Sequence, residues 1–328
     1  MENIISEYAP VMIPTLCRYE HFKRCIESLS NCIGSKNTVV YVGLDYPAKE
    51  SHWEGYRKIK DYLEHCGNLN FKKLIIEYRD HNCGFGPQGN SALLQKEIFK
   101  HYDRYITSED DNEFSSNFLQ YMNKGLELFK DDDKIFAICG FSHDYNLGDY
   151  EYNYYVFSGS CSWGLGFWKN KFLEYKKFCA TNPPRTLLLS KKTYKTFNND
   201  LRAINALLIM NRKRVVWGDF YMNIYCKLKG MHIVFPTIRK VRNWGNDGSG
   251  AQCVKIKNDV FCSMPIDEAN TFEYDNIKDV MSKKEYIKLC LSQYMKISKR
   301  TYLKMLCNAV IFILLLFVDC FDKKQKDS

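Results

Sequence analysis

Two spacings of apolar residues alternate along residues 1–140 of the chain. Short apolar runs, typical of buried strands, occupy residues 9–15, 38–44, 74–78, 104–108 and 135–140. Between these runs, apolar residues recur three and four positions apart, as Phe22, Cys25 and Ile26 do, and this spacing predicts helices. Alternating strands and helices are typical of an open, mostly parallel sheet with helices on both faces. We therefore predict an α/β fold.

The second half of the chain is less regular. It contains clusters of aromatic residues, a Pro-Pro pair at 183–184 and a loop rich in Gly, Asn and Asp at 243–250. A helix is predicted at 220–229, directly after Asp219. This pattern is typical of a substrate-facing region built from loops and short helices.

The formal net charge is concentrated at one end of the sequence. The chain carries 47 Lys and Arg against 38 Asp and Glu, a net charge of +9. Residues 282–328 hold ten basic and four acidic residues, so this segment carries +6 and the other 281 residues carry +3. A body with so little net charge is not expected to bind nucleic acid, and the basic signal is assigned to the C-terminus.

The 14 cysteines are scattered along the chain. They form no CxxC pair, and the sequence has no HExxH motif, so a structural zinc site is not expected. The first seven residues lack the basic and apolar stretches of a secretion signal. We therefore expect a reducing, cytoplasmic compartment.

Residues 305–318 are strongly apolar and are interrupted only by Asn308. The unbroken run, 309–318, is ten residues long, which is shorter than the ~20 residues of a membrane-spanning helix. Basic residues flank it at 296–304 and at 323–326. We predict a shallow or in-plane anchor on an anionic membrane surface. A buried C-terminal helix and an oligomer contact are the alternatives.

Three consecutive acids, Glu109, Asp110 and Asp111, follow the predicted strand at 104–108. Ligands of an open α/β sheet bind beyond the carboxyl ends of its strands, and three adjacent carboxylates at such an end repel one another. A bound Mg²⁺ or Mn²⁺ ion would relieve the repulsion, since both ions prefer oxygen ligands. The alternative is a solvated acidic turn that caps the next helix, and the two interpretations are compatible.

Residues 84–89 read Gly-Phe-Gly-Pro-Gln-Gly, which matches the GxGxxG pattern of dinucleotide-binding loops. Two features argue against that function. Five residues separate the strand from the first glycine, and Pro87 removes an amide that would bind pyrophosphate. We interpret the segment as a loop lying against a nucleotide diphosphate or a sugar, with a plain flexible loop as the alternative.

The motifs of the first half occur in a characteristic order. Pro14-Thr15 with Arg18 follows the first strand, Asp45 ends the second strand, and the segment 79–84 and the triplet 109–111 come next. This order resembles the nucleotide-sugar glycosyltransferases of the GT-A fold. The triplet also carries a more distant resemblance, to the N-acetylglucosaminyltransferase that starts hybrid and complex N-glycans.

Segments of the second half strengthen this resemblance. Residues 162–169 read Ser-Trp-Gly-Leu-Gly-Phe-Trp-Lys, which is similar to the Ser-Trp-Gly-x-x-x-Trp-Lys segment of bacterial polysaccharide glycosyltransferases. The segments 217–220 (Trp-Gly-Asp-Phe) and 241–250 are similar to later motifs of the same enzymes. The resemblance covers roughly residues 9–255.

The resemblance implies a role for each matching residue. Asp111 would be the direct ligand of Mn²⁺ or Mg²⁺, and Asp219 would be the general base that deprotonates the acceptor hydroxyl. An N-cap of the following helix is the alternative role of Asp219. Contacts to the donor nucleotide-sugar are implied for Pro14, Thr15, Arg18, Asp45, Arg79, Asn82, Gly84, Glu109 and Asp110.

The acceptor would meet the segment that begins at Ser162. Trp163 and Trp168 offer aromatic faces on which a sugar ring can stack, and Gly164 lies beside the first of them. A buried aromatic cluster between sheet and helices is the alternative for both tryptophans.

The resemblance further implies an inverting, metal-dependent transfer from a UDP-sugar to a glycan or a lipid-linked acceptor in cell-surface polysaccharide synthesis. The enzyme would be peripheral on the inner face of the cell membrane. The expected domains are a catalytic domain at 1–255 with halves 1–140 and 141–255, a helical extension at 256–300 and the tail at 301–328. A nucleotidyltransferase acting on sugar phosphates and a non-catalytic membrane-bound scaffold are the alternatives.

Overall fold

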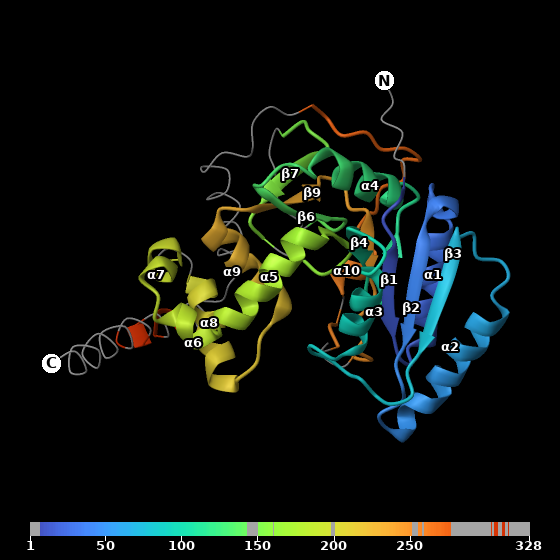
Figure 1. Cartoon of the computed structure of the whole chain (residues 1–328), viewed down its shortest axis with the longest axis horizontal. Coiled ribbons are helices and arrows are strands. Elements are labelled where there is room, and N and C mark those ends of the chain that lie inside the picture. The colour runs from blue at the N-terminus through green and yellow to red at the C-terminus, as the bar shows by residue number, and fades with distance from the viewer. Residues whose placement is uncertain are drawn as a thin grey trace.

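The structure is a computed structural model of the whole chain (Figure 1). It describes residues 7–142, 150–159, 161–197, 201–250, 255–257 and 259–276, together with residues 303, 305–307, 310, 311 and 314.

Eight strands form one sheet in the order β3-β2-β1-β4-β8-β6-β9-β7. Strands β1 to β4 are parallel neighbours, as is the pair β6 and β9, whereas β8 and β7 run antiparallel to the strands beside them. The predicted α/β class with an open, mostly parallel sheet is therefore confirmed. The strands are β1 Val11–Thr15, β2 Val39–Leu44, β3 Lys73–Tyr78, β4 Arg104–Thr107, β6 Ile135–Cys139, β7 Tyr154–Phe157, β8 Leu165–Trp168 and β9 His232–Pro236.

Helices cover both faces of the sheet, because alternate strand residues point to opposite sides. Val11 and Ile13 of β1 belong to one apolar core, and Met12 between them belongs to the other. The first core includes residues of α1 (Tyr19–Ser30), α2 (Trp53–His65) and α4 (Phe118–Leu128). The second core includes residues of α3 (Asn90–Ile98), α5 (Lys169–Thr181) and α9 (Gly218–Lys229).

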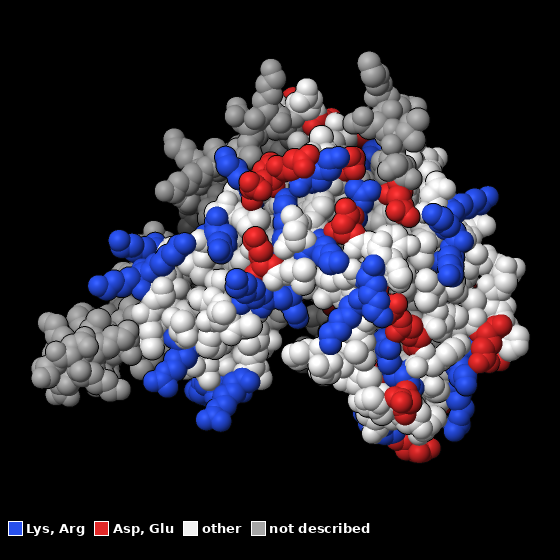
Figure 2. All heavy atoms as spheres, in the orientation of Figure 1, with Lys and Arg blue, Asp and Glu red and all other residues white. Residues whose placement is uncertain are grey.

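Three further helices, which we call the helical lobe, lie at one end of the molecule's longest axis (Figure 1). They are α6 (Pro184–Leu188), α7 (Lys191–Phe197) and α8 (Leu201–Lys213). Their apolar side chains form a third, smaller core with one face of α9. Figure 2 shows the visible face of the molecule hollowed between this lobe and the part that holds β1 to β3.

Two short strands join segments far apart in the sequence. β5 (Asn112–Phe114) pairs antiparallel with β10 (Val241–Asn243). The pairing brings the loop at 243–250 beside the acidic triplet, a proximity that neither segment's own pattern predicts. The remaining elements are the short helices η1 (Ser35–Asn37), η2 (Glu50–His52) and α10 (Val260–Ser263).

The segment at 264–275 packs along the body of the protein. Asp267 pairs with the buried Lys240 and also accepts a hydrogen bond of 3.0 Å from Asn117. The ring of Tyr274 stacks on Tyr121 of α4 at a centroid distance of 5.3 Å. This part of the expected extension at 256–300 is therefore attached to the body of the protein.

The described residues of the C-terminal tail are helical. Leu303, Val310, Ile311 and Leu314 are exposed, whereas Met305 is buried. Within the described part of the chain, no helix is long and apolar enough to cross a membrane. The rest of the predicted anchor, including the basic residues at 323–326, lies outside the described residues.

Candidate functional site

The acidic triplet follows β4 after one intervening residue, Ser108, at the edge of the sheet where the parallel strands β1, β2 and β4 have their carboxyl ends. Asp110 and Asp111 are buried, with 6% and 4% of their surface exposed. Burial of this kind excludes the solvated acidic turn. Two buried carboxylates need a compensating positive charge or hydrogen-bond donors, since a buried unpaired charge is costly.

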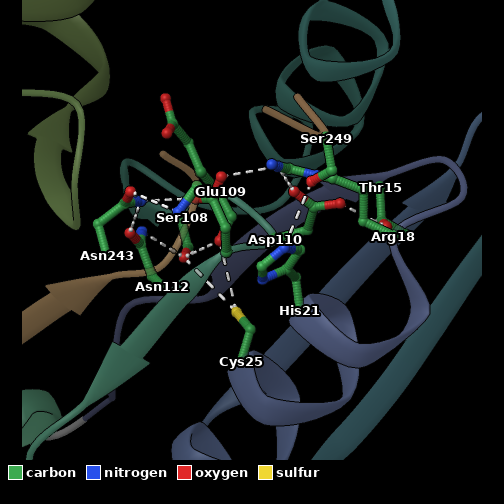
Figure 3. Close-up of polar contacts among 12 residues, drawn as sticks. Thr15, Arg18, His21, Cys25, Ser108, Glu109, Asp110, Asn112, Asn243 and Ser249 are labelled. Atoms are coloured by element: carbon green, nitrogen blue, oxygen red, sulfur yellow. Dashed lines mark hydrogen bonds and ion pairs between the residues drawn. The ribbon is translucent and has the colours of Figure 1, made fainter. Parts of the chain in front are cut away.

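Arg18, in the loop after β1, supplies that charge (Figure 3). Its Nη2 atom pairs with Asp110 and lies 2.8 Å from Oδ2 of Asp111. The Thr15 hydroxyl, at the last residue of β1, donates a hydrogen bond of 2.9 Å to Asp110. The loop after β1 and the loop after β4 therefore meet in one cluster, in which one guanidinium faces two carboxylates and the formal charge stays negative.

Glu109 points to a different partner from its two neighbours. Ser162 donates through Oγ to Glu109 at 3.0 Å and to Asp219 at 3.3 Å. Burial, with the nearby charges of Asp111 and Asp219, raises the pKa of Glu109 to about 7. Ser162 was part of a sequence motif but carried no predicted role, because only the folded chain shows which two carboxylates it joins.

Asp219 lies in the first turn of α9, where a carboxylate interacts favourably with the helix dipole. Burial raises the pKa of this carboxyl group, against the opposing effect of the Ser162 hydrogen bonds. The helix begins at Gly218 with Trp217 as its N-cap, so Asp219 is not the capping residue. The Ser162 hydroxyl therefore links Asp219 to Glu109 of the triplet, which lies 110 residues away in the sequence.

Asp111 is fixed from the opposite side by the last residue of β10 and by the loop that follows it. Asn243 donates through Nδ2 to Asp111 at 2.6 Å and to Asn112 at 3.0 Å. The backbone amide of Trp244 donates to the Asp111 carbonyl at 2.9 Å. A Cβ atom on Gly245 would stand 2.2 Å from the Asp111 carboxylate, so this position requires glycine. Asn243 and Gly245 are site residues that the sequence did not reveal.

Asp45, at the end of β2, organises the loop after β3. Its carboxylate accepts hydrogen bonds from the amides of Cys83 at 2.8 Å and Gly84 at 3.0 Å. Asn82 donates to the Tyr46 carbonyl at 2.6 Å. These three hydrogen bonds fold the loop onto the end of β2, so Asp45 positions the loop. A contact of Asp45 with the donor nucleotide-sugar stays a prediction.

Arg79 begins the same loop and is held from two sides. Its Nε atom donates to Asn90 at 2.9 Å, and its Nη1 atom lies 2.8 Å from Glu77. Asn90, the first residue of α3, also donates to the Gly43 carbonyl at 2.7 Å. In the glycine-rich segment, Gly84 adopts a φ of 57°, which explains a glycine there.

The predicted acceptor residues occupy three different environments. Trp163 is partly buried and packs edge-on against Phe141 and Phe261, at centroid distances of 4.6 and 5.2 Å. Gly164 has a φ of 71° and no room for a Cβ atom, which would approach Val241 at 2.9 Å. The packing of the Trp163 ring and the lack of space at Gly164 therefore explain these two residue types without an acceptor.

Trp168 lies away from this group. It is paired with Arg104, the first residue of β4, whereas the triplet follows the last residue of that strand. The indole is 6% exposed, donates to the Leu126 carbonyl at 3.0 Å and carries Lys171 over its ring. The antiparallel strand β8 takes Trp168 to the opposite edge of the sheet from the triplet, which favours the alternative of a buried aromatic residue, and an acceptor contact of Trp168 stays a prediction.

The chemistry of this edge fits an anionic ligand with a divalent cation. Arg18 Nη1 and Arg79 Nη2 are buried, and neither has a hydrogen-bond partner among the residues that the structure describes. A buried N–H group without an acceptor is costly, and a phosphate oxygen would supply the missing acceptor. Pro14, the residue before Thr15 in β1, lies at the same edge.

A cation also fits beside Asp111. The two buried aspartates already converge on one positively charged nitrogen, so the space between them favours positive charge. No group of three or more His, Cys, Asp and Glu side chains that could hold a metal occurs in the described ranges. An ion bound to Asp111 would therefore take further oxygen ligands from phosphate groups, as Mg²⁺ commonly does.

Comparison with known proteins gives a likeness in fold. No known protein family and no curated protein matches the sequence. Part of the chain is similar to residues 1–349 of TarS from S. aureus, with 14% identity, coverage of 52% of this chain and 49% of that one, and a TM-score of 0.34.

Two further solved structures show the same level of similarity. TarS 1–349 in complex with UDP-GlcNAc is 17% identical, with coverage of 40% of this chain and 33% of that one and a TM-score of 0.28. The mannosyltransferase PcManGT from Pyrobaculum calidifontis, in complex with GDP-Man and Mn²⁺, is 10% identical, with coverage of 51% and 46% and a TM-score of 0.34. The chain spans less than half the length of each of these structures, and the likeness concerns the fold alone.

Proposed function

We propose that the protein is a glycosyltransferase that moves a sugar from a nucleoside diphosphate, UDP in the first instance, to a hydroxyl group of a glycan or a lipid-linked acceptor. One observation carries the proposal. At the carboxyl edge of the parallel strands, Arg18 pairs with the buried carboxylates after β4, and Arg79 follows β3 at the same edge. Each arginine has a buried N–H group without a partner among the described residues. This is the charge pattern that a diphosphate leaving group requires.

The donor side is built by the loops after β1, β2 and β3. Arg18 and Arg79 would bind the diphosphate oxygens, and Asp45 holds the loop at 82–84 in place. Asp111 would hold Mn²⁺ or Mg²⁺. Such an ion, when bound, neutralises part of the negative charge that develops on the leaving diphosphate.

The acceptor side is built around Asp219. In the proposed reaction the acceptor oxygen attacks the anomeric carbon, the bond from that carbon to the diphosphate oxygen breaks, and Asp219 takes the proton of the attacking hydroxyl. Transfer in one displacement inverts the anomeric configuration. The raised pKa of Asp219 suits it to accept a proton near neutral pH, since a base with a higher pKa binds the proton more strongly.

A panel of nucleotide-sugars, each with and without Mn²⁺, tests the proposal by thermal shift and by donor hydrolysis. We expect at least one UDP-sugar to raise the melting temperature. If no donor binds under either condition, the protein is not a nucleotide-sugar transferase. The nucleotidyltransferase and the non-catalytic scaffold then become the favoured functions.

Asp219→Asn separates the two halves of the site. The substitution should lower transfer by about 10²–10⁴-fold, as loss of a general base does, and leave the donor-induced thermal shift intact. Asp61→Asn, at an exposed position on α2, is the control and should change neither quantity. Full transfer activity in Asp219→Asn would refute its role as the base.

The tail at 301–328 is proposed to hold the enzyme on the inner face of the cell membrane, as part of cell-surface polysaccharide synthesis. Its exposed residues Leu303, Val310, Ile311 and Leu314 and the flanking basic residues support this proposal. Deletion of residues 296–328 should weaken binding to anionic vesicles and leave donor binding unchanged. Unchanged vesicle binding would show that the tail is not an anchor.

A further inference from the structure

A second basic region lies in the sequence of the body, well before the C-terminal tail. Residues 175–218 contain ten Lys and Arg and a single acid, Asp200, so this stretch carries a formal charge of +9. That value equals the net charge of the whole chain, and the rest of the sequence is therefore neutral in sum. A sum of charge over residues 1–281 does not show this cluster of positive charge, because acidic residues elsewhere in the same range cancel it.

Seven described basic side chains of this stretch are exposed on the helical lobe or on the residue that follows it. Arg185 lies on α6, three lysines lie on α7, and a basic run ends α8. Figure 2 shows Lys and Arg, and no Asp or Glu, along the lower left edge of the visible face, where this lobe lies. We call the basic face the exposed residues Arg185, Lys191, Lys192, Lys195, Arg212, Lys213 and Arg214.

Exposed apolar residues continue directly from the basic face. Val215, Val216 and Trp217 are 40%, 55% and 37% exposed, and Phe220 in the first turn of α9 is 38% exposed. The rings of Trp217 and Phe220 meet at a centroid distance of 6.0 Å. Four large apolar residues within six positions of a surface segment mark an interaction site, since such side chains are normally buried. We call them the apolar loop.

The backbone between the two features is in an unusual conformation. Arg214 has a φ of 53° and is the one residue other than glycine, within the described ranges, whose φ is positive. The amide of Val215 donates to the Met210 carbonyl at 3.1 Å, which closes α8 with the turn that ordinarily has glycine in the position of Arg214. The chain thus carries a charged side chain where glycine would be less strained.

We propose that the basic face and the apolar loop together dock on an anionic lipid bilayer. Cations attract the negative headgroups, and valine and aromatic side chains enter the interface between headgroups and acyl chains, where tryptophan is enriched. The apolar loop favours a bilayer over nucleic acid, because a phosphate backbone offers nothing to Val215 and Val216. The described tail residues lie at the same end of the longest axis as the helical lobe (Figure 1).

Docking on a bilayer would bring a lipid-linked acceptor to the enzyme. This part of the inference rests on the proposed glycosyltransferase function. Asp219 lies between Trp217 and Phe220 in the sequence. Its carboxylate contacts the Ser162 hydroxyl, which also contacts Glu109 of the triplet. A bilayer held against the apolar loop would therefore stand next to the proposed base. This arrangement suits an acceptor whose sugar is carried on a membrane lipid.

The test measures binding of the full-length protein to phosphatidylcholine vesicles with and without phosphatidylglycerol. The variant Arg212→Ser/Lys213→Ser/Arg214→Gly removes three charges of the basic face and should weaken binding to the anionic vesicles about 100-fold. It should not lower the melting temperature, because glycine relieves the strain at position 214. Removal of the exposed cations Lys36, Lys72 and Lys73, which lie around β3, is the matched control and should leave binding nearly unchanged.

Val215→Ser/Val216→Ser tests the apolar loop separately and should weaken binding about tenfold in the same assay. The proposal is overturned if both variants bind as the parent does, if the control loses as much as the basic-face variant, or if the parent prefers duplex DNA to the vesicles at equal salt. Thermal shift with the panel of nucleotide-sugars is measured in parallel. Failure of every donor would sink the proposed function and leave the vesicle result standing, whereas loss of docking leaves donor binding untouched.

Discussion

Replacement of Arg18 by methionine gives the sharpest test of the charge balance at the site. Methionine keeps much of the volume of arginine and removes the charge that pairs with Asp110 and Asp111. Because both aspartates are buried, the variant must either bury an uncompensated charge or keep one carboxyl group protonated. The second option is the cheaper one, and its cost can be calculated.

The ordinary pKa of an aspartate is 3.8, and burial already raises the pKa of Asp110 above it in the parent protein. One pKa unit corresponds to 1.36 kcal/mol, so protonation of one aspartate near pH 7 costs about 4 kcal/mol. Near pH 5 the same protonation costs about 2 kcal/mol. A carboxyl group with a raised pKa binds more protons in the folded state, so the stability of the variant rises as the pH falls.

Urea unfolding followed by the fluorescence of the five tryptophans measures the effect. Arg18→Met should lower the free energy of unfolding by about 4 kcal/mol near pH 7 and by about half of that near pH 5. Arg104→Met is the control, since Arg104 pairs at 3.0 Å with the partly exposed Glu127, and it should cost about 1 kcal/mol or less at either pH. A loss below about 1 kcal/mol for Arg18→Met, or an equal loss at both pH values, would refute the reasoning.

Two further substitutions test the structure around this cluster. Gly245→Ala places a Cβ atom 2.2 Å from the carboxylate of Asp111, which Arg18 and Asn243 hold in place. The free energy of unfolding should therefore fall by about 1–3 kcal/mol. Gly67→Ala is the control and should be nearly neutral, because the space around Gly67 is open. Burial raises the pKa of Asp267, but hydrogen bonds from Lys240, Asn117 and the Ala269 amide outweigh it and hold the pKa below its ordinary value. Asp267→Asn should therefore destabilise the protein by about 1–3 kcal/mol at neutral pH, and its deficit should disappear as the pH falls through the lowered pKa; a deficit that persists in acid would show that the ion pair does not stabilise the fold.

The sequence predicted the parts of the site that depend on local pattern. Buried strands are short apolar runs, so the positions of Thr15, Asp45 and the triplet at strand ends followed from the chain itself. The general rule that parallel strands share a carboxyl edge then placed these residues together. The contact of Arg18 and Thr15 with Asp110 is the structural counterpart of that expectation.

The parts that the sequence did not predict depend on pairing between distant segments. Asn243 reaches Asp111 only because β10 pairs with β5, and three-residue strands are too short to give a pattern. The distance of Trp168 from the triplet was not predicted either, because β8 is antiparallel within a mostly parallel sheet and four apolar residues do not show the direction of a strand. The basic face was missed for a related reason, since a sum of charge over the body takes no account of where each residue lies in the fold.

The position of Arg18 also determines how the two expected ligands affect each other. Its Nη1 atom has no partner among the described residues, so a diphosphate can bind there while Nη2 stays on the aspartates. A divalent ion at Asp111 would instead compete with Nη2 for the same carboxylate oxygen. Metal should therefore bind weakly without nucleotide and more tightly with it, because the diphosphate offers the displaced guanidinium a new partner and gives the ion further oxygen ligands.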